Sequence, residues 1–396
     1  MASGREVVVL SGVRTAIGDY GGALKDVAPT ELSAQVIREA VKRAKVDAKE
    51  VGACVIGNVI HTEAKDMYLS RVAALKGGLP EDSTALTVNR LCGSGLQAIV
   101  SASQMITLGD ADVAVGGGVE SMSRGGYMMP SLRWGQRMSD GAVIDMMVGA
   151  LTDPFDTVHM GITAENIAEK WKISRAQQDE FSVESHRRAI NAIEKGYFKD
   201  QILPVELKTR KGTTVFDRDE HPRADASLES LAKLRAAFKK DGSVTAGNAS
   251  GINDGAAAVV LMERAAADKK GLKPMARLVS YGIAGVDPKI MGIGPVPAST
   301  RALAKAGLKV EQMDVVESNE AFAVQALAVT CDLKLDPRKT NPNGGAVGLG
   351  HPIGATGAIL AVKALYELQR SGGKYALVTM CIGGGQGIAA VFERLH

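Results

Sequence analysis

The two ends of this 396-residue chain repeat the same order of segments. Helical apolar spacing ends at Ala44 and again at Ala306, and a buried-helix pattern contains Gly95 and again Gly357. Both pairs lie 262 residues apart (44 to 306 and 95 to 357). Two elements in one register favour a duplicated unit, which restricts the chain to folds built from two similar halves.

Each copy mixes strand and helix patterns. A strand is predicted at 113–115 and closed by Gly116–Gly118, and its counterpart at 375–379 is closed by Gly383–Gly385. These triplets are 267 residues apart (116 to 383), which predicts a short insertion before the third element. The predicted fold class is therefore α/β, with two similar, mostly parallel or mixed sheets covered by helices.

The middle of the chain, from about 121 to 251, follows a different pattern. It contains one clear helical stretch at 174–195 and then a charged segment. A solvated surface is the usual reading of such a segment, but if the ligand is phosphorylated, its phosphates would bind here. Its basic residues are Lys208, Arg210, Lys211, Arg218, Arg223, Lys233, Arg235, Lys239 and Lys240.

Composition excludes several classes of protein. The net charge is only +3 and no basic-aromatic stripe is present, so nucleic-acid binding is not expected. The four cysteines are isolated and show no metal-ligand spacing, which argues against a zinc site or disulfides. We found no run of 18 apolar residues and no signal peptide before the first strand pattern, and therefore expect a reduced, cytoplasmic protein without membrane spans.

Cys92 follows an apolar strand pattern at 85–88 and precedes a long helix pattern. We expect it at a strand-to-helix turn, where N–H groups and the positive end of a helix dipole stabilise a thiolate. This position predicts a lowered pKa and a nucleophile. The alternative is a small, buried structural cysteine.

Three further polar residues stand where loops leave predicted strands: Asn319, His351 and Cys381. If the halves pack across a pseudo-twofold axis, these turns converge on Cys92. A histidine can deprotonate the thiol, a second cysteine can act as acid or base, and glycine-rich backbone can bind an oxyanion.

Several motifs, in one order along nearly the whole chain, resemble those of the thiolase family. They are Asn89-Arg-Leu-Cys-Gly-Ser-Gly-Leu-Gln97, Gly116-Gly-Gly-Val-Glu-Ser-Met-Ser123, His159-Met-Gly161, Thr245-Ala-Gly-Asn-Ala-Ser-Gly251, Asn319-Glu-Ala-Phe-Ala323, Gly350-His-Pro-Ile-Gly354 and Cys381-Ile-Gly-Gly-Gly-Gln-Gly387. The chain looks most like bacterial acetyl-CoA acetyltransferases and the β-ketothiolases of polyhydroxyalkanoate synthesis.

The resemblance implies a thiolase fold, a duplicated αβαβα five-layered core with an inserted loop domain. The first half would comprise 1–120 and 252–273, the loop domain that binds coenzyme A 121–251, and the second half 274–396. The implied reaction is the reversible Claisen condensation of an acyl-CoA with acetyl-CoA, or thiolytic cleavage of a 3-ketoacyl-CoA, through an S-acyl-cysteine. Acyl-CoA thioesters would be substrates, no cofactor or metal is implied, and the assembly would be a homotetramer.

The resemblance also implies roles for the polar residues. Cys92 would carry the acyl group after activation by His351, and Cys381 would exchange a proton with the α-carbon of acetyl-CoA. Asn319, through a water, and His351 would hold the enolate oxygen. The N–H groups of Cys92 and Gly383 would form a second oxyanion hole.

The positions implied to contact coenzyme A are Leu151, His159, Met160, Arg223, Ser230, Phe238, Ala246 and Ser250, with Phe322 near the pantetheine. Ser318 departs from the family, which usually has leucine or alanine there. The segment Asp66-Met-Tyr-Leu-Ser-Arg71 resembles β-ketothiolases that accept substrates longer than acetoacetyl-CoA.

Two alternatives stay open at this point. A decarboxylating condensing enzyme has the same fold but normally pairs its cysteine with two histidines or with histidine and asparagine. A non-catalytic acyl-CoA or lipid carrier would need none of the reactive groups.

Overall fold

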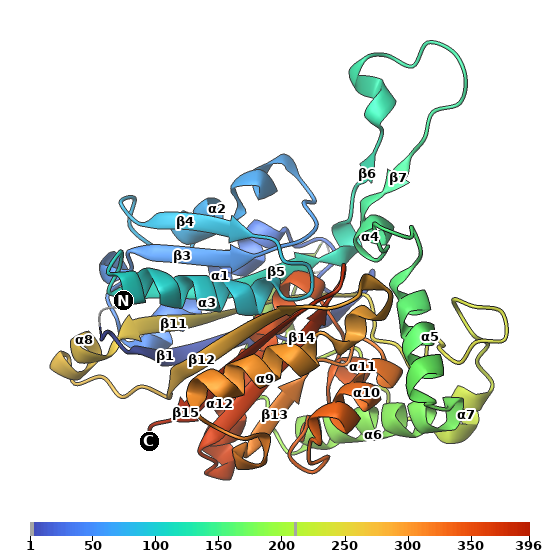
Figure 1. Ribbon diagram of the computed structural model, residues 1–396. Coiled ribbons are helices and arrows are strands. Elements are labelled where there is room, and N and C mark those ends of the chain that lie inside the picture. The colour runs from blue at the N-terminus through green and yellow to red at the C-terminus, as the bar shows by residue number, and fades with distance from the viewer. Residues whose placement is uncertain (1–3, 210–211) are drawn as a thin grey trace.

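The computed structural model describes residues 4–209 and 212–396 (Figure 1). Met1–Ser3, part of the predicted start before the first strand, and Arg210 and Lys211 of the charged segment lie outside the described residues. Within the described residues, the two predicted sheets are joined into one mixed sheet flanked by helices. It has 11 strands, nine in one continuous order and two short ones paired beside it.

The first half contributes five strands of this sheet, in the order β4-β3-β5-β11-β1 from the edge inwards. Strands β3 and β4 run parallel, as do β3 and β5, whereas the remaining neighbours are antiparallel. The strands are β1 (Val7–Thr15), β3 (Ala53–Gly57), β4 (Thr84–Val88), β5 (Val113–Ser121) and β11 (Asn253–Glu263).

The second half repeats this order as β13-β14-β15-β12, and the two halves meet where β1 pairs with β12. An isolated parallel bridge between Val316 and Thr340 stands at the edge where the first half has β4. The strands are β12 (Ala276–Gly285), β13 (Val315–Ser318), β14 (Tyr375–Ile382) and β15 (Gln386–Arg394).

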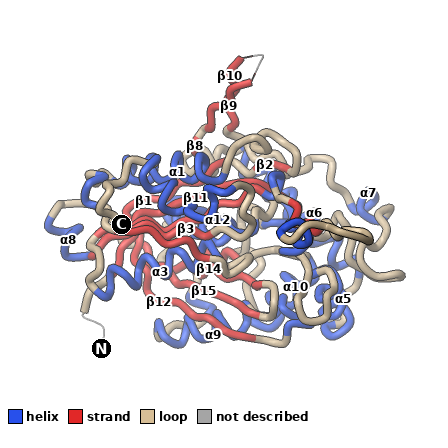
Figure 2. Tube along the Cα trace, turned by 90° about the horizontal axis from the view of Figure 1, so that it is seen from above, coloured by secondary structure: helices blue, strands red, loops and turns tan. Residues whose placement is uncertain are grey.

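The helices form layers on both sides of each half-sheet (Figures 1 and 2). Helices α3 and α12 pack against each other between the half-sheets, while α1 and α2 cover one outer face and α9 and α10 the other, which is the predicted five-layer order. Their bounds are α1 (Pro29–Ala44), α2 (Leu69–Lys76), α3 (Ser94–Leu108), α9 (Pro295–Ala306), α10 (Ala323–Leu333) and α12 (Ile353–Ser371).

The 262-residue register extends further than the sequence pattern indicated. Strand β3 begins at Ala53 and β13 at Val315, and β5 begins at Val113 and β14 at Tyr375, each 262 residues later (53 to 315, 113 to 375). The predicted insertion before the third element is therefore wrong.

The glycine triplets that suggested this insertion are not equivalent. Gly116–Gly118 lies inside β5, whereas the triplet at 383–385 forms the turn after β14. The first triplet lets helices approach the strand closely: a Cβ at Gly116 would lie 2.7 Å from Cα of Ile99, and one at Gly118 would lie 2.3 Å from the carbonyl oxygen of Gly354. The strand therefore continues through the glycines instead of ending at them.

The inserted segment is more regular than the sequence indicated. Besides α6, which matches the predicted helix, it has a second long helix, α5, and two short hairpins; the β6–β7 hairpin carries an arm that projects from the body (Figure 1). The elements are β6 (Tyr127–Met128), β7 (Ile144–Asp145), α4 (Met146–Ala150), α5 (Met160–Trp171), α6 (Arg175–Glu194), β8 (Ile202–Leu203), β9 (Val205–Thr209), β10 (Gly212–Phe216) and α7 (Leu228–Ala232). Short β2 (Gly18–Asp19) and α8 (Arg264–Lys269) flank the first half, and α11 (Ala346–Leu349) precedes α12.

The predicted domain boundaries stay predictions.

One window, Leu91–Leu108, is long and apolar enough by composition to cross a membrane, contrary to the prediction that no run reaches this length. It consists of the Cys92 turn and α3. The helix packs against α12 and the strands β3 and β5, so burial on several sides accounts for its apolar composition.

We expect Gly357→Ala to destabilise the protein because the new Cβ would lie 2.4 Å from the backbone nitrogen of Leu96 in α3. Overpacking of this kind costs about 1–3 kcal/mol. Thermal unfolding should therefore show a lower Tm. Gly149→Ala is the control, since a Cβ there has no heavy atom within 4 Å; equal Tm values for the two variants would contradict the proposed tight contact.

Candidate active site

Cys92 lies in the turn between β4 and α3, as predicted. The residue before it, Leu91, has a φ of 44°, a conformation that non-glycine residues rarely adopt. The Ser94 hydroxyl closes the turn, because it donates to the carbonyl oxygen of Leu91 at 2.6 Å and accepts the N–H of Arg90 at 2.8 Å. The turn therefore presents Cys92 to the adjoining cavity in a defined position.

The pKa of Cys92 differs from the prediction. Burial raises the pKa of this thiol to about 11, and the nearby Glu120 carboxyl acts in the same direction. Hydrogen bonds from the N–H groups of Gly383 and of Cys92 itself lower the pKa but do not balance the burial. The predicted lowering is therefore wrong: the Cys92 thiol is neutral at pH 7 and would need a base to react as a thiolate.

His351 has the properties of such a base. Its Nδ1 lies 2.6 Å from the hydroxyl of Thr356, which itself donates to the carbonyl oxygen of Pro352 at 2.8 Å. The hydroxyl oxygen must then accept a hydrogen bond from Nδ1–H, so the other ring nitrogen, Nε2, carries the lone pair. Burial lowers the pKa of His351 to about 4, so the ring is neutral at pH 7.

Asn319 lies beside this histidine, with its Nδ2 3.4 Å from Nε2 of His351. The asparagine is fully buried, and its Oδ1 has no hydrogen-bond partner within residues 4–209 and 212–396. A buried amide oxygen without a partner is costly, so this atom is available to a bound molecule.

Cys381 is buried at the end of β14. Burial raises the pKa of its thiol, and the nearby Cys92 acts in the same direction, which places the two sulfurs close to each other. The chain then turns sharply, with φ values of 82° at Gly384 and 85° at Gly385 that favour glycine. This turn aims the N–H of Gly383 at the sulfur of Cys92.

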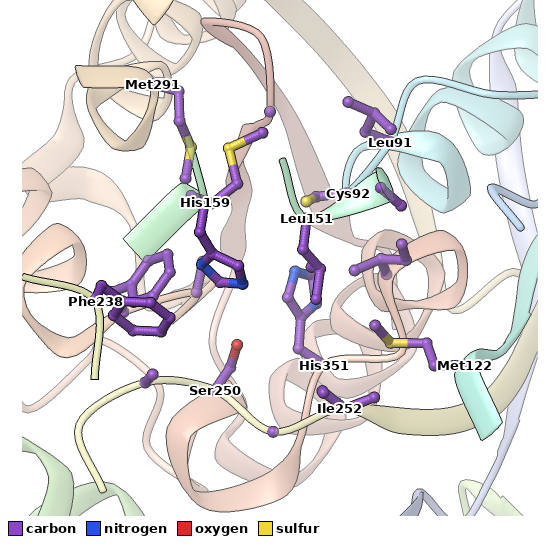
Figure 3. Close-up of a pocket in the computed structure, with 18 of the residues that line it drawn as sticks. Leu91, Cys92, Met122, Leu151, His159, Phe238, Ser250, Ile252, Met291 and His351 are labelled. Atoms are coloured by element: carbon purple, nitrogen blue, oxygen red, sulfur yellow. The ribbon is translucent and has the colours of Figure 1, made fainter. Parts of the chain in front are cut away.

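Cys92, His351 and Gly383 line a cavity of about 360 Å³, and Figure 3 shows Cys92 and His351 facing the same space within it. Asn319 and Cys381 are not among its lining residues, but Asn319 lies beside His351 and the thiol of Cys381 interacts with that of Cys92. The predicted site residues that line the cavity are Cys92, Leu151, His159, Met160, Phe238, Ala246, Ser250, Phe322, His351 and Gly383.

Aromatic rings form one wall of this cavity (Figure 3). The rings of His159 and Phe238 stack with centroids 4.5 Å apart, and Phe322 meets Phe238 edge-on at 6.2 Å. A Cβ at Gly161 would lie 2.2 Å from the Phe238 ring, so the glycine after His159-Met160 leaves room for the stack. The wall is largely aromatic and provides stacking surface for an apolar part of a ligand.

Two predicted contact residues do not line the cavity. The N–H of Arg223 donates to Nδ1 of His186 at 3.2 Å, and Arg223 lines a separate surface depression. Ser230 is exposed in α7, where its hydroxyl donates to the carbonyl oxygen of Ser227. Both stay predictions for an extended ligand that reaches beyond the cavity.

The sequence reasoning missed several residues that shape the site. Thr356 sits five residues after His351 and sets its tautomer, a contact that the helical phase of α12 could have suggested. Glu120 is buried and accepts hydrogen bonds from the N–H groups of Val59, Ile60 and Gly354, which ties the first turn of α12 to the first half. Apolar lining residues carried no signal in a single sequence; they are Leu91, Met122, Ala150, Ala237, Ala249, Ile252, Met291, Ala321 and Ile353.

Comparison with known proteins agrees with this geometry. The model of the thiolase N-terminal domain matches residues 7–265, and that of the C-terminal domain matches residues 272–394. The chain is 67% identical to the β-ketothiolase BktB of Cupriavidus necator, over 99% of this chain and all of that protein.

Solved structures show the same likeness. The acetyl-CoA acetyltransferase of Bacillus anthracis superimposes with a TM-score of 0.97 at 50% identity and 99% coverage of both chains. Human mitochondrial 3-ketoacyl-CoA thiolase in complex with CoA has a TM-score of 0.97 at 46% identity and covers both chains completely. The chain therefore belongs to the thiolase family of acyltransferases.

The raised pKa of Cys92 predicts how its alkylation depends on pH. We expect the rate of iodoacetamide addition to Cys92 to rise about tenfold per pH unit between pH 7 and 10, because only the thiolate reacts. Peptide mass spectrometry separates this site from the exposed Cys331. A rate that already reaches a plateau below pH 8 would instead indicate a preformed thiolate.

Proposed function

We propose that this chain is a β-ketothiolase that condenses an acyl-CoA with acetyl-CoA reversibly to a 3-ketoacyl-CoA. The observation that carries the proposal is one cavity with Cys92 and His351 in its wall and the buried Cys381 close enough to Cys92 for the two thiols to interact. Two thiols and an imidazole suffice for thioester exchange and for a carbon-carbon bond, since a thioester both acylates a thiolate and acidifies its own α-carbon.

In the first stage, Nε2 of His351 takes the proton of Cys92, and the thiolate attacks the acyl carbon. The bond from this carbon to the sulfur of coenzyme A breaks, and the leaving thiolate takes the proton of Cys381. S-acyl-Cys92, a Cys381 thiolate and a protonated His351 result. The N–H groups of Cys92 and Gly383 stabilise the oxyanion during the transfer.

In the second stage, the Cys381 thiolate removes a proton from the methyl group of acetyl-CoA. Protonated His351 and Asn319, the latter through a water, stabilise the enolate oxygen. The enolate carbon attacks the acyl carbon on Cys92, the bond to the Cys92 sulfur breaks, and this sulfur recovers its proton from His351. Every group returns to its starting state, so the cycle requires no other reagent.

The cavity supports the proposed binding of the coenzyme A arm. Leu151, Met160, Phe238 and Phe322 supply an apolar passage to Cys92, and their neighbours Ala246 and Ser250 extend its lining. Arg223 and Ser230 would contact the nucleotide end outside the cavity. The proposed site requires no metal or redox cofactor.

The substrates that the protein requires distinguish the proposed β-ketothiolase from the two alternative functions. A decarboxylating enzyme would depend on malonyl-CoA, and a carrier would bind acyl-CoA without turnover. We propose that two molecules of acetyl-CoA suffice, and that rates for acetoacetyl-CoA, 3-ketovaleryl-CoA and 3-ketohexanoyl-CoA will define the accepted acyl length.

We further propose a cytoplasmic homotetramer. All four cysteines are unpaired, which suits a reducing compartment. The arm between β6 and β7 exposes large apolar side chains, including Leu132, Trp134 and Met138. Such side chains on a projecting arm favour contact with a second copy of the chain.

The two cysteines should fail at different steps. Cys92→Ser should form no acyl-enzyme, and its turnover should fall at least about 1000-fold. Cys381→Ser should still acquire one acetyl group from acetyl-CoA, but its rate of condensation should be about as low as that of Cys92→Ser. Intact-protein mass spectrometry and acetoacetyl-CoA absorbance measure these outcomes. The exposed Cys331→Ser is the control and should keep wild-type turnover; near-normal turnover of Cys92→Ser would refute the proposed nucleophile.

Removing apolar side chains from the arm should produce a smaller oligomer. We expect Trp134→Ser with Met138→Ser to shift the sedimentation coefficient to a smaller oligomer, because both side chains are 87% exposed in the single chain. Leu108→Ser, at an exposed residue outside the arm, serves as the control. Unchanged sedimentation of the arm variant would contradict its role in assembly.

A further inference from the structure

Asn253 is a fully buried residue at the start of β11 with no role in the chemistry described above. Its Oδ1 accepts the backbone N–H of His351 at 2.8 Å. Its Nδ2 donates to the carbonyl oxygen of Gly18 at 3.1 Å and to Oδ1 of Asp19 at 3.0 Å. The amide thus connects the backbone of the proposed base to the short strand β2 of the first half.

The chain around this amide contains glycines that leave space for it. Gly350, directly before His351, has a φ of 102°, and a Cβ there would lie 2.5 Å from Cγ of Asn253. A Cβ at Gly251 would lie 2.6 Å from Oδ1 of Asn253 and 2.4 Å from the ring of His221. Neither position can hold a larger side chain unless the amide moves.

Asp19 and the carbonyl oxygen of Gly18 determine which way the amide faces. An asparagine can present either its oxygen or its nitrogen to a given neighbour, and the neighbour's chemistry decides between them. Nδ1 of His221 lies 2.7 Å from Oδ1 of Asp19, and this hydrogen bond lowers the pKa of Asp19. The ionised carboxylate and the carbonyl oxygen of Gly18 only accept, so Nδ2 faces them and Oδ1 faces His351.

The segment that carries Asn253 also touches the substrate cavity. Ser250, Gly251 and Ile252 line the cavity directly before Asn253. One short stretch therefore contacts the space for the substrate and holds the backbone of His351. A displacement of about 1 Å in a reacting group can cost about 100-fold in rate, so this connection affects catalysis.

We propose that Asn253 is a positioning residue for acyl transfer, which holds His351 in line with Cys92, and that Asp19 and His221 orient its amide. This inference rests on the proposed function because Asn253 acts through His351. It predicts an effect on the rate of acyl transfer and little effect on the affinity for the acyl-CoA.

The first test is Asn253→Asp, which keeps an acceptor for the N–H of His351 but cannot donate to Gly18 or Asp19. We expect kcat, and the rate of acetyl-enzyme formation by rapid quench, to fall about 10- to 100-fold, while KM for acetyl-CoA changes less than about threefold. Asp19→Ala reports on the same contact from a side chain that is 42% exposed, so the variant should fold. We expect its kcat to fall about threefold to tenfold.

The second test exchanges donor and acceptor. In the double variant Asp19→Asn with Asn253→Asp, the amide at position 19 can donate to one oxygen of the carboxylate at position 253. The other oxygen of this carboxylate then again accepts the backbone N–H of His351. We expect the double variant to be at least about fivefold faster than Asn253→Asp alone. A role limited to general stability would produce no such recovery.

Asn343→Asp is the matched control. Asn343 is also buried, and its Nδ2 donates to the carboxylate of Glu367 at 2.8 Å, so the substitution makes the same charge change away from the cavity. We expect a lower Tm with an unchanged kcat. Wild-type kcat in Asn253→Asp and Asp19→Ala, or no recovery in the double variant, would overturn the inference alone. A wild-type protein without acyl transfer would instead overturn the proposed function, and the inference with it.

Discussion

The close contact between α3 and α12 is the constraint on which the rest of the structure depends. A Cβ at Gly95 would lie 2.7 Å from the backbone nitrogen of Ala358, and one at Gly357 would lie 2.4 Å from that of Leu96. The two glycines hold equivalent positions in the duplicated halves, so one close approach is made twice across the pseudo-twofold axis. The first turns of both helices then face one cavity, with Cys92 before α3 and His351 before α12.

Burial at this contact also determines the protonation of the site. Loss of hydration disfavours charge, so the pKa of Cys92 is raised to about 11 and that of His351 is lowered to about 4. Both groups are neutral at pH 7, so the proposed reaction requires a proton to move from Cys92 to His351. Such a transfer depends on the placement of His351, which Thr356, Asn319 and Asn253 all contact.

Local patterns predicted much of the fold. Helices α1, α3 and α6, the turn at Cys92 and the mixed sheets follow from apolar spacing and glycine placement, because these depend on neighbours along the chain. The predictions were wrong where the structure depends on contacts between residues that are distant in sequence. Gly116–Gly118 looked like a strand end, yet it lies inside β5 because helices press against it. The lowered pKa expected for Cys92 ignored the burial that the second half imposes.

The sequence alone determined the duplicated α/β frame, the strand-to-helix turn at Cys92 and, through its motifs, the family. Those properties lie in residue order and spacing, which are read directly from the chain. Only the tertiary structure decided that ten of the predicted site residues line one cavity, that Arg223 and Ser230 lie outside it, and that Asn253 holds His351. The contact between Asn253 and His351 joins residues that are 98 apart in sequence, and the cavity combines residues from Leu91 to Gly383, so both exist only once the two halves pack against each other.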